Sequence, residues 1–193
     1  MPVSNAELTQ MFEHVLKLSR VDETQSVAVL KSHYSDPRTV NAAMEAAQRL
    51  KAKVYAVELP SFNHPTAMGN DMTAYCGDTA LTGNLAAQRA LEAADLIVDT
   101  MMLLHSPEQE QILKTGTRIL LAVEPPEVLA RMLPSEDDKR RVQAAETVLK
   151  QARSMHVRSK AGSDFHAPLG QYPAVTEYGY ADEPGRWDHW PSG

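Results

Sequence analysis

The chain has 193 residues and a net charge of −6, with 43% hydrophobic and 23% charged residues, values that exclude a disordered or collagen-like chain. Phosphate binding needs concentrated positive charge and no Lys/Arg cluster occurs, so nucleic acid is not an expected partner. The single cysteine, Cys76, can form no internal disulfide and no Cys-based zinc site, which indicates a reducing compartment. The longest apolar stretches, such as residues 119–123, are too short to span a bilayer. We expect a cytoplasmic globular protein without a membrane segment.

The first third of the chain alternates between helical and strand patterns. Apolar residues at helical spacing predict an amphipathic helix over residues 5–19, with Ser4 or Asn5 as its N-cap. Four consecutive apolar residues predict a strand over 26–31 that is buried on both faces. Asp36-Pro37 then begins a helix that runs to about residue 50, with proline at the first helical position.

The middle of the chain continues this alternation after a loop-rich interruption. Residues 53–59 read as a second buried strand. Residues 60–83 are rich in Pro and Gly, and we expect a short helix near 66–70 inside them. An Ala-rich helix over 84–94 then leads into a third strand, Leu-Ile-Val-Asp, within the segment 95–104.

Two more helix–strand units complete the alternation. The sequence predicts helices over 107–114, 127–133 and 135–153, the last with an acidic first turn that complements the helix dipole. It predicts a fourth strand over 117–123 and a fifth over 155–159. Strands that alternate with helices through short connections indicate an α/β doubly wound, mostly parallel sheet of the Rossmann-like type.

The regular alternation stops near Lys160. Residues 160–193 hold both tryptophans and many of the glycines and tyrosines, an unusual composition because terminal segments are usually polar. The short segments with Tyr, Gly and Pro beyond this point indicate the beginning of a second domain or an edge of the sheet. We expect an α/β domain over residues 1–160 and the beginning of a second domain, truncated here, over residues 161–193.

Candidate functional residues are those that follow strands, because ligands in open parallel sheets bind beyond the carboxyl ends of the strands. These positions are residues 32–34, 58–63, 101–106, 124–126 and 160–164. His105 follows the third strand and could act as a general acid or base near neutral pH, although it could equally cap or pack at the strand end. His33 has a similar position after the first strand. The other candidates are more simply read as structural or solvated, namely His14, His64, His156 and His166.

His189 lies in the aromatic ending of the chain. Trp187 and Trp190 flank it in sequence, and Asp188 and Arg186 are close. Aromatic walls can desolvate a histidine and so tune its pKa, and a packed structural corner is the alternative.

Several site types have no sequence signature. No Gly-x-Gly-x-x-Gly follows the first strand and no Walker motif occurs, so a dinucleotide or nucleotide site is not expected. Cys76 lacks an obvious local base, which favours a structural thiol. No His/Glu/Asp cluster at metal-ligand spacing occurs, and we predict no metal ligand in this chain.

Four long segments carry a resemblance that covers the whole chain: VSNAELTQMFEHVLKLSRVDETQSVAVL, FNHPTAMGNDMTAYCGDTALTG, DTMMLLHSPEQEQIL and KAGSDFHAPLGQYPAVTEYGYADEPGRWDHWPSG. Together they resemble the 2,5-dihydroxypyridine 5,6-dioxygenase family of bacterial nicotinic-acid degradation. More distantly, the sequence is similar to the thermophilic-type leucyl aminopeptidases.

The resemblance implies a non-haem Fe(II) enzyme that opens the ring of 2,5-dihydroxypyridine with O2 to give N-formylmaleamic acid. It implies an acid/base role for His105, which lies in the matching segment DTMMLLHSP, because the 5-hydroxyl of the substrate must lose a proton. His189, in the matching RWDHWPSG, would orient the substrate or would contact the residues that bind it. Ser192, in the same segment, would be a hydrogen-bond donor with one of these roles.

The family's chain continues beyond residue 193, and the resemblance places its iron ligands there. We therefore expect this chain alone to bind no catalytic iron and to be inactive, and we expect the complete protein to be a homo-oligomer. Two alternatives remain open: the N-terminal half of a related metallo-aminopeptidase, and a non-catalytic α/β binding domain.

Overall fold

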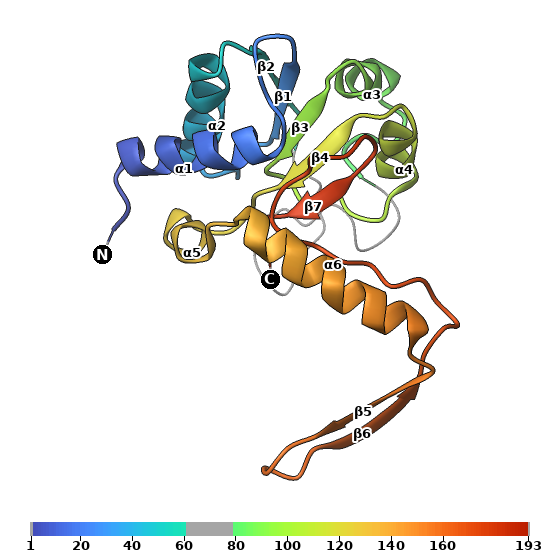
Figure 1. Ribbon diagram of the computed structural model, residues 1–193. Coiled ribbons are helices and arrows are strands. Elements are labelled where there is room, and N and C mark those ends of the chain that lie inside the picture. The colour runs from blue at the N-terminus through green and yellow to red at the C-terminus, as the bar shows by residue number, and fades with distance from the viewer. Residues whose placement is uncertain (1, 61–78, 193) are drawn as a thin grey trace.

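The computed structural model describes residues 2–60 and 79–192. Its centre is a five-stranded sheet with the order β2-β1-β3-β4-β7, in which every pairing is parallel. Its strands are β1 (Ser26–Lys31), β2 (Lys53–Glu58), β3 (Leu96–Asp99), β4 (Arg118–Leu121) and β7 (Trp187–His189). This sheet, with helices on both faces, confirms the predicted α/β class (Figure 1).

Helices connect and cover the strands. They are α1 (Asn5–Leu18), α2 (Pro37–Arg49), α3 (Leu85–Glu92), α4 (Pro107–Lys114), α5 (Pro126–Leu129) with a 3₁₀ turn η1 (Ala130–Met132), and α6 (Glu136–Gln151). The predicted helix at 66–70, as well as His64 and Cys76, lies outside the described residues. Within the described ranges, no helix is long and apolar enough to cross a membrane.

Side-chain caps fix where the helices begin. Ser4 caps α1: its hydroxyl accepts a hydrogen bond from the Glu7 N–H at 3.2 Å, and the Glu7 carboxylate accepts one from the Ser4 N–H at 2.8 Å. This reciprocal pair satisfies two N–H groups that have no partner within the helix. Of the two predicted candidates, Ser4 and not Asn5 is therefore the N-cap. Asp36 caps α2 through the Arg38 N–H at 2.7 Å, as the Asp36-Pro37 pair predicted.

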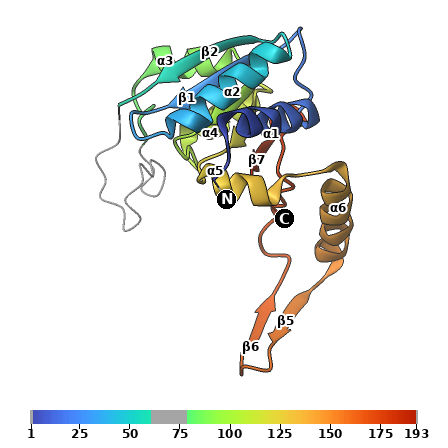
Figure 2. The ribbon, with the colours of Figure 1, turned by 90° about the vertical axis from the view of Figure 1, so that its left-hand side faces the viewer.

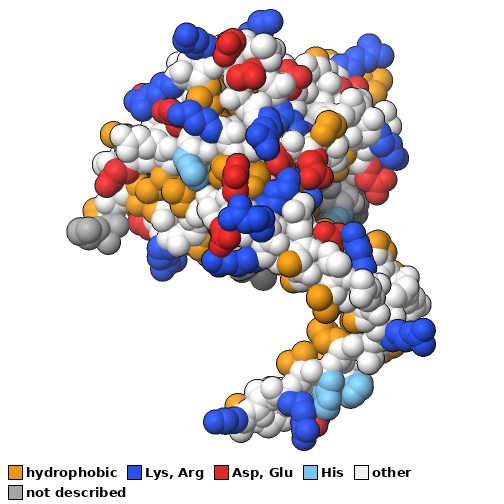
Figure 3. Space-filling model, in the orientation of Figure 1, with side chains coloured by type: hydrophobic (Ala, Val, Ile, Leu, Met, Phe, Trp, Pro, Cys, Tyr) orange, Lys and Arg blue, Asp and Glu red, His pale blue; other side chains and the backbone are white. Residues whose placement is uncertain are grey.

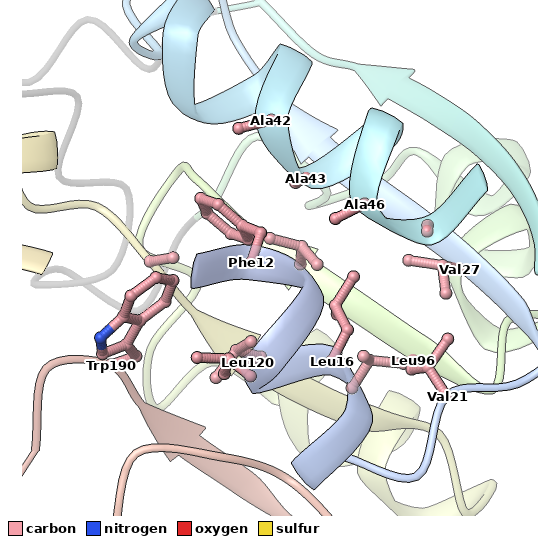
Figure 4. Packing of buried hydrophobic residues seen from close by; sticks show 14 of the residues in the cluster. Phe12, Leu16, Val21, Val27, Ala42, Ala43, Ala46, Leu96, Leu120 and Trp190 are labelled. Atoms are coloured by element: carbon pink, nitrogen blue, oxygen red, sulfur yellow. The ribbon is translucent and has the colours of Figure 1, made fainter. Parts of the chain in front are cut away.

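Alternation along the strands divides the core into two clusters, one on each face of the sheet. Val27 and Val29 point to the α1/α2 face, where Phe12 packs edge-on against Trp190 at 5.0 Å between ring centroids (Figure 4). Ala28 and Leu30 point to the opposite face, which α3 and α4 cover. The predicted burial of the first strand on both faces is therefore confirmed.

The second predicted strand is not buried as expected. Its six residues are exposed or half-exposed, because β2 is the edge strand of the sheet. Glu58 at its end forms an exposed ion pair with Lys31 at 2.8 Å. An apolar run does not distinguish an edge strand from a central one, and this distinction depends on strand order, which the sequence does not contain.

The prediction that residues 155–159 form the fifth strand of the main sheet is wrong. β5 (Ser154–Arg158) pairs antiparallel with β6 (Asp164–Pro168) in a separate hairpin, and all five residues of β5 are exposed. Together with α6, which buries no residue, this hairpin forms an arm that extends from the body (Figures 1 and 2). Figure 3 shows hydrophobic and histidine side chains on the surface of this arm, where Val157 is 45% and Phe165 55% exposed.

The fifth strand of the sheet comes instead from the aromatic ending of the chain. β7 pairs with β4 in the register Leu121↔His189, and Trp190 follows it into the α1/α2 core. The domain boundary expected at residue 160 remains a prediction, but Trp187–His189 belong to the sheet of the segment before that boundary.

Candidate functional site

The carboxyl ends of β3, β4 and β7 bring acidic and histidine side chains to one edge of the sheet. The register aligns Asp99 with Leu121 and Leu121 with His189. Residues in register across parallel strands point to the same face, so Asp99 and His189 share the α3/α4 face, two strands or roughly 10 Å apart. This is the edge where the strand-end rule predicted a ligand site.

Asp99 ends β3 and is completely buried. Its carboxylate accepts hydrogen bonds from the Met101 N–H at 2.7 Å and the Leu103 N–H at 2.6 Å, which fold the chain into a tight turn. Burial raises the pKa of Asp99 to about 6, and the backbone N–H donors and His189 oppose that rise. Asp99 therefore shapes the loop that leads to His105.

This loop is further held by Gln109 of α4, which is 4% exposed. Its amide oxygen accepts from the His105 N–H at 2.6 Å, and its amide nitrogen donates to the Leu103 carbonyl at 2.7 Å. The loop needs such support because Met102 and His105 have positive φ angles of 62° and 50°, which cost energy for residues other than glycine. Sequence reasoning assigned no role to Gln109.

The His105 side chain is exposed at the N-terminus of α4, the position that the sequence predicted. Within residues 2–60 and 79–192, no hydrogen bond or ion pair joins its imidazole to His189 or Ser192. The structure therefore places His105 at the predicted edge of the sheet without bringing it into contact with the other two predicted residues.

His189 contacts two glutamates. Its Nε2 lies 3.0 Å from both Oε1 and Oε2 of Glu124, and its Nδ1 lies 3.9 Å from Oε2 of Glu177. Burial opposes the charged imidazolium, but the Glu124 hydrogen bond and the charges of Glu124, Glu177 and Asp188 together raise the pKa of His189. The Ser192 hydroxyl also lies near Glu177, donating to Oε2 at 3.5 Å. His189 and Ser192, predicted separately, thus meet at Glu177.

Only one of the two predicted aromatic walls lies beside His189. Trp187 stacks near the imidazole with ring centroids 6.4 Å apart, because residues two apart on a strand share a face. Trp190 lies on the opposite face in the core, where its indole N–H donates to the Met132 carbonyl at 3.0 Å. The expectation that both tryptophans enclose His189 is corrected accordingly.

Buried Asp188 fixes the segment that carries Glu177. Its carboxylate accepts from the Tyr178 and Gly179 N–H groups at 3.0 and 2.7 Å and from the Arg186 guanidinium at 2.6 Å. Burial raises the pKa of Asp188 to about 6, and the Arg186 charge opposes that rise. Gly179 has φ +93° and lies so near Pro134 that a Cβ would come within 2.6 Å of the Pro134 Cβ, so only glycine fits here.

Of the remaining described histidines, His14, His156 and His166 lie away from this edge, whereas His33 follows the end of β1 at the same edge. His14 Nε2 lies 2.8 Å from the Pro134 carbonyl, a contact that supports its structural reading. His156 and His166 stack at 4.3 Å on the exposed hairpin, and His33 stacks on Tyr34 at 3.9 Å.

Metal binding can be tested against the donor set of the described residues. Among them, no group of three or more His, Cys, Asp or Glu side chains could hold a metal ion. The described part of the chain therefore does not fit an iron centre by itself.

Comparison with known proteins identifies the family. The family model for 2,5-dihydroxypyridine 5,6-dioxygenase matches residues 7–193. This chain belongs to the 2,5-dihydroxypyridine 5,6-dioxygenase family. It is 96% identical, over its whole length, to a protein of that name from Pseudomonas putida KT2440. A solved structure of 2,5-dihydroxypyridine dioxygenase from the same organism matches it with a TM-score of 0.93 over 100% of the chain.

The chain spans 55% of the length of these two dioxygenase relatives. The identity of 96% and the TM-score of 0.93 confirm both the resemblance read from the sequence and the fold. The sequence analysis placed Glu124 at the ligand edge without assigning it a role, and it missed Glu177. The strand-end rule finds Glu124 because that residue follows β4, whereas Glu177 reaches the site only through the pairing of β7 with β4.

Proposed function

We propose that this chain is the N-terminal part of a dioxygenase that opens the ring of 2,5-dihydroxypyridine with O2. Both oxygen atoms enter the product, N-formylmaleamic acid. The observation that carries this proposal is the 96% identity, over all 193 residues, to the Pseudomonas putida protein named for this reaction. We further propose a cytoplasmic homo-oligomer as the form of the complete protein.

Fe(II) in the complete enzyme would supply the activation of O2. The described residues offer no ligand set for it, so we propose that the ligands lie in the part of the protein outside this chain. The chain by itself is therefore expected to bind no catalytic iron and to cleave no substrate.

The residues of this chain would act on the substrate hydroxyl groups. We assign to His105 the acid/base role, because its exposed imidazole stands at the ligand edge and histidine exchanges protons near neutral pH. We assign to His189 and Ser192 the orientation of the substrate, since both converge on Glu177 at the same edge.

An oxygen-electrode assay with 2,5-dihydroxypyridine and Fe(II) tests the proposal on this chain and on the full-length protein. We expect O2 uptake by the full-length protein alone. Hydrolysis of leucyl peptides without O2 uptake would replace the dioxygenase by the aminopeptidase alternative, and neither activity would favour a binding domain. His105→Ala in the full-length protein should reduce turnover at every pH, and unchanged turnover would refute its role.

A further inference from the structure

Glu124 makes an unusually complete contact with His189. The Glu124 carboxylate places both oxygens 3.0 Å from Nε2, and the two side chains are similarly shielded, at 24% and 22% exposure. Glu124 follows β4 and His189 ends β7, so adjacent strands of the sheet carry the two partners. A carboxylate that accepts from one ring nitrogen fixes both the orientation of the imidazole and the location of its protons.

The other ring nitrogen is left for a ligand. Nδ1 faces Glu177 at 3.9 Å, a distance beyond hydrogen bonding. Across the described ranges, no residue makes a hydrogen bond with Nδ1, whereas Nε2 is fully engaged by Glu124. The imidazole therefore has one committed nitrogen and one available donor at the ligand edge of the sheet.

The charges around the ring favour the imidazolium. Among the described residues, Glu124 after β4, Glu177 before β7 and Asp99 on β3 are the acidic groups on its side of the sheet. Asp188 also favours the charged ring, although it points to the opposite face of β7 and pairs there with Arg186. Burial opposes the cation, but the pKa of His189 is nevertheless raised. A partly buried cation with an available N–H is suited to an anionic oxygen, because charge-assisted hydrogen bonds are about twice as strong as neutral ones.

We propose that Glu124 is a positioning residue that holds His189 with its Nδ1–H available to an anionic hydroxyl oxygen of the substrate ring. This inference rests on the proposed function, because a dihydroxypyridine that loses a hydroxyl proton carries such an oxygen. Glu124 itself touches His189 and not the substrate.

The test uses full-length protein with its metal. Glu124→Gln keeps the size of the side chain and removes its charge, and the matched control is Glu13→Gln on α1. Glu13 has a similar exposure of 26% and pairs with Lys17, far from the site in sequence and on a different element. Two quantities are measured between pH 5.5 and 9: kcat/KM for O2 uptake, and the dissociation constant of 2,5-dihydroxypyridine without O2.

In Glu124→Gln we expect the basic limb of both profiles to move down by about one pH unit, because the loss of an adjacent carboxylate lowers the pKa of a histidine. At pH 8 this makes binding roughly tenfold weaker, and Glu13→Gln should behave as wild type. A basic limb at the wild-type pH in Glu124→Gln would overturn the inference.

Glu124→Asp provides a second test if the glutamine variant does not fold. It retains the charge with a shorter reach, so the basic limb should stay at the wild-type pH while the dissociation constant rises. If the basic limb of Glu124→Asp instead moved down by about one pH unit, as we expect for Glu124→Gln, the positioning role would be overturned. Absence of O2 uptake by wild type would instead refute the proposed function, and the anaerobic binding profile would still decide the role of Glu124.

Discussion

The ends of β3 and β7 are organised around two buried aspartates that differ in one respect. Asp99 and Asp188 are both fully buried, and each accepts hydrogen bonds from two backbone N–H groups of a nearby loop. Asp188 also pairs with Arg186 at 2.6 Å, whereas no Lys or Arg of the described residues pairs with Asp99. The comparison separates backbone anchoring, which both residues provide, from charge pairing, which only Asp188 provides.

The largest expected effect comes from removing the paired aspartate. Asp188→Ala leaves Arg186 partly buried without its partner and removes the acceptor of three backbone N–H groups, so we expect a loss of roughly 3–5 kcal/mol in the free energy of unfolding. Asp99→Ala removes only a carboxylate that accepts hydrogen bonds from backbone N–H groups, and it should lower the free energy of unfolding by about 2 kcal/mol. Urea unfolding monitored by tryptophan fluorescence measures both. Equal losses would mean that the Arg186 pair contributes nothing and that the two strand ends are equivalent.

Gln109→Leu tests the anchoring at the end of β3. This substitution removes both hydrogen bonds to the loop and leaves the His105 N–H and Leu103 carbonyl without partners, at a cost of about 2 kcal/mol. Amide hydrogen exchange at Leu103 and His105 should accelerate.

Gln88→Leu is the control for this effect. Gln88 makes a partly buried i,i+4 hydrogen bond with Glu92 on α3, worth at most about 0.5 kcal/mol. A loss as small in Gln109→Leu would show that the positive φ angles of the loop do not depend on the amide.

The sequence predicts those elements of the fold that have a local signal, and it does not predict those that depend on contacts between distant segments. The apolar run Val27–Leu30 and the caps Ser4 and Asp36 are local signals, and the structure confirms the elements that they predicted. β7 was missed because its three residues are too few to show a period, and its place beside β4 depends on contacts between distant segments. The polar–apolar alternation of β5 is typical of a strand with a solvated face, but it does not tell which sheet the strand joins.

The candidate site divides in the same way. The strand-end rule placed His105 and Glu124 at the correct edge, because it needs only the order of elements along the chain. Glu177 could not be predicted, since it reaches His189 through a turn that Asp188 and Gly179 hold in place. Gln109 was hidden for a similar reason: its two hydrogen bonds are made to backbone atoms, which carry no sequence signal.

The pH dependence of stability is a property that the two strand ends share, because burial raises the pKa of both aspartates. The pKa of Asp99 and that of Asp188 each rise to about 6 from an ordinary 3.8, so the folded state binds more protons than the unfolded state in this interval. Stability should therefore fall as the pH rises from about 4 through 6. The raised pKa of His189 acts in the same direction at higher pH, because its contribution is present below about 6.5 and is lost as the pH rises through the folded-state pKa.

Asp99→Asn should reduce the slope of the lower part of this pH profile, and it should leave the contributions of Asp188 and His189. Unfolding midpoints in urea at intervals from pH 4 to 8 measure the difference. An unchanged slope between pH 4 and 6 would mean that Asp99 does not titrate in this range and that its backbone donors outweigh its burial.

The smallest expected effect on stability is that of Ser192→Ala. The Ser192 hydroxyl donates to Glu177 at 3.5 Å, a long hydrogen bond at a half-buried position, so its loss should change the free energy of unfolding by less than about 0.5 kcal/mol.

If Ser192 orients the substrate, as we propose, KM in the full-length protein should nevertheless rise severalfold with little change in kcat. If it only supports Glu177, the variant should instead shift the pH profile that depends on His189, because Glu177 contributes to the raised pKa of His189. A rise in KM without a shift in pH places Ser192 at the substrate, and a shift without a rise places it among the residues that anchor the end of β7.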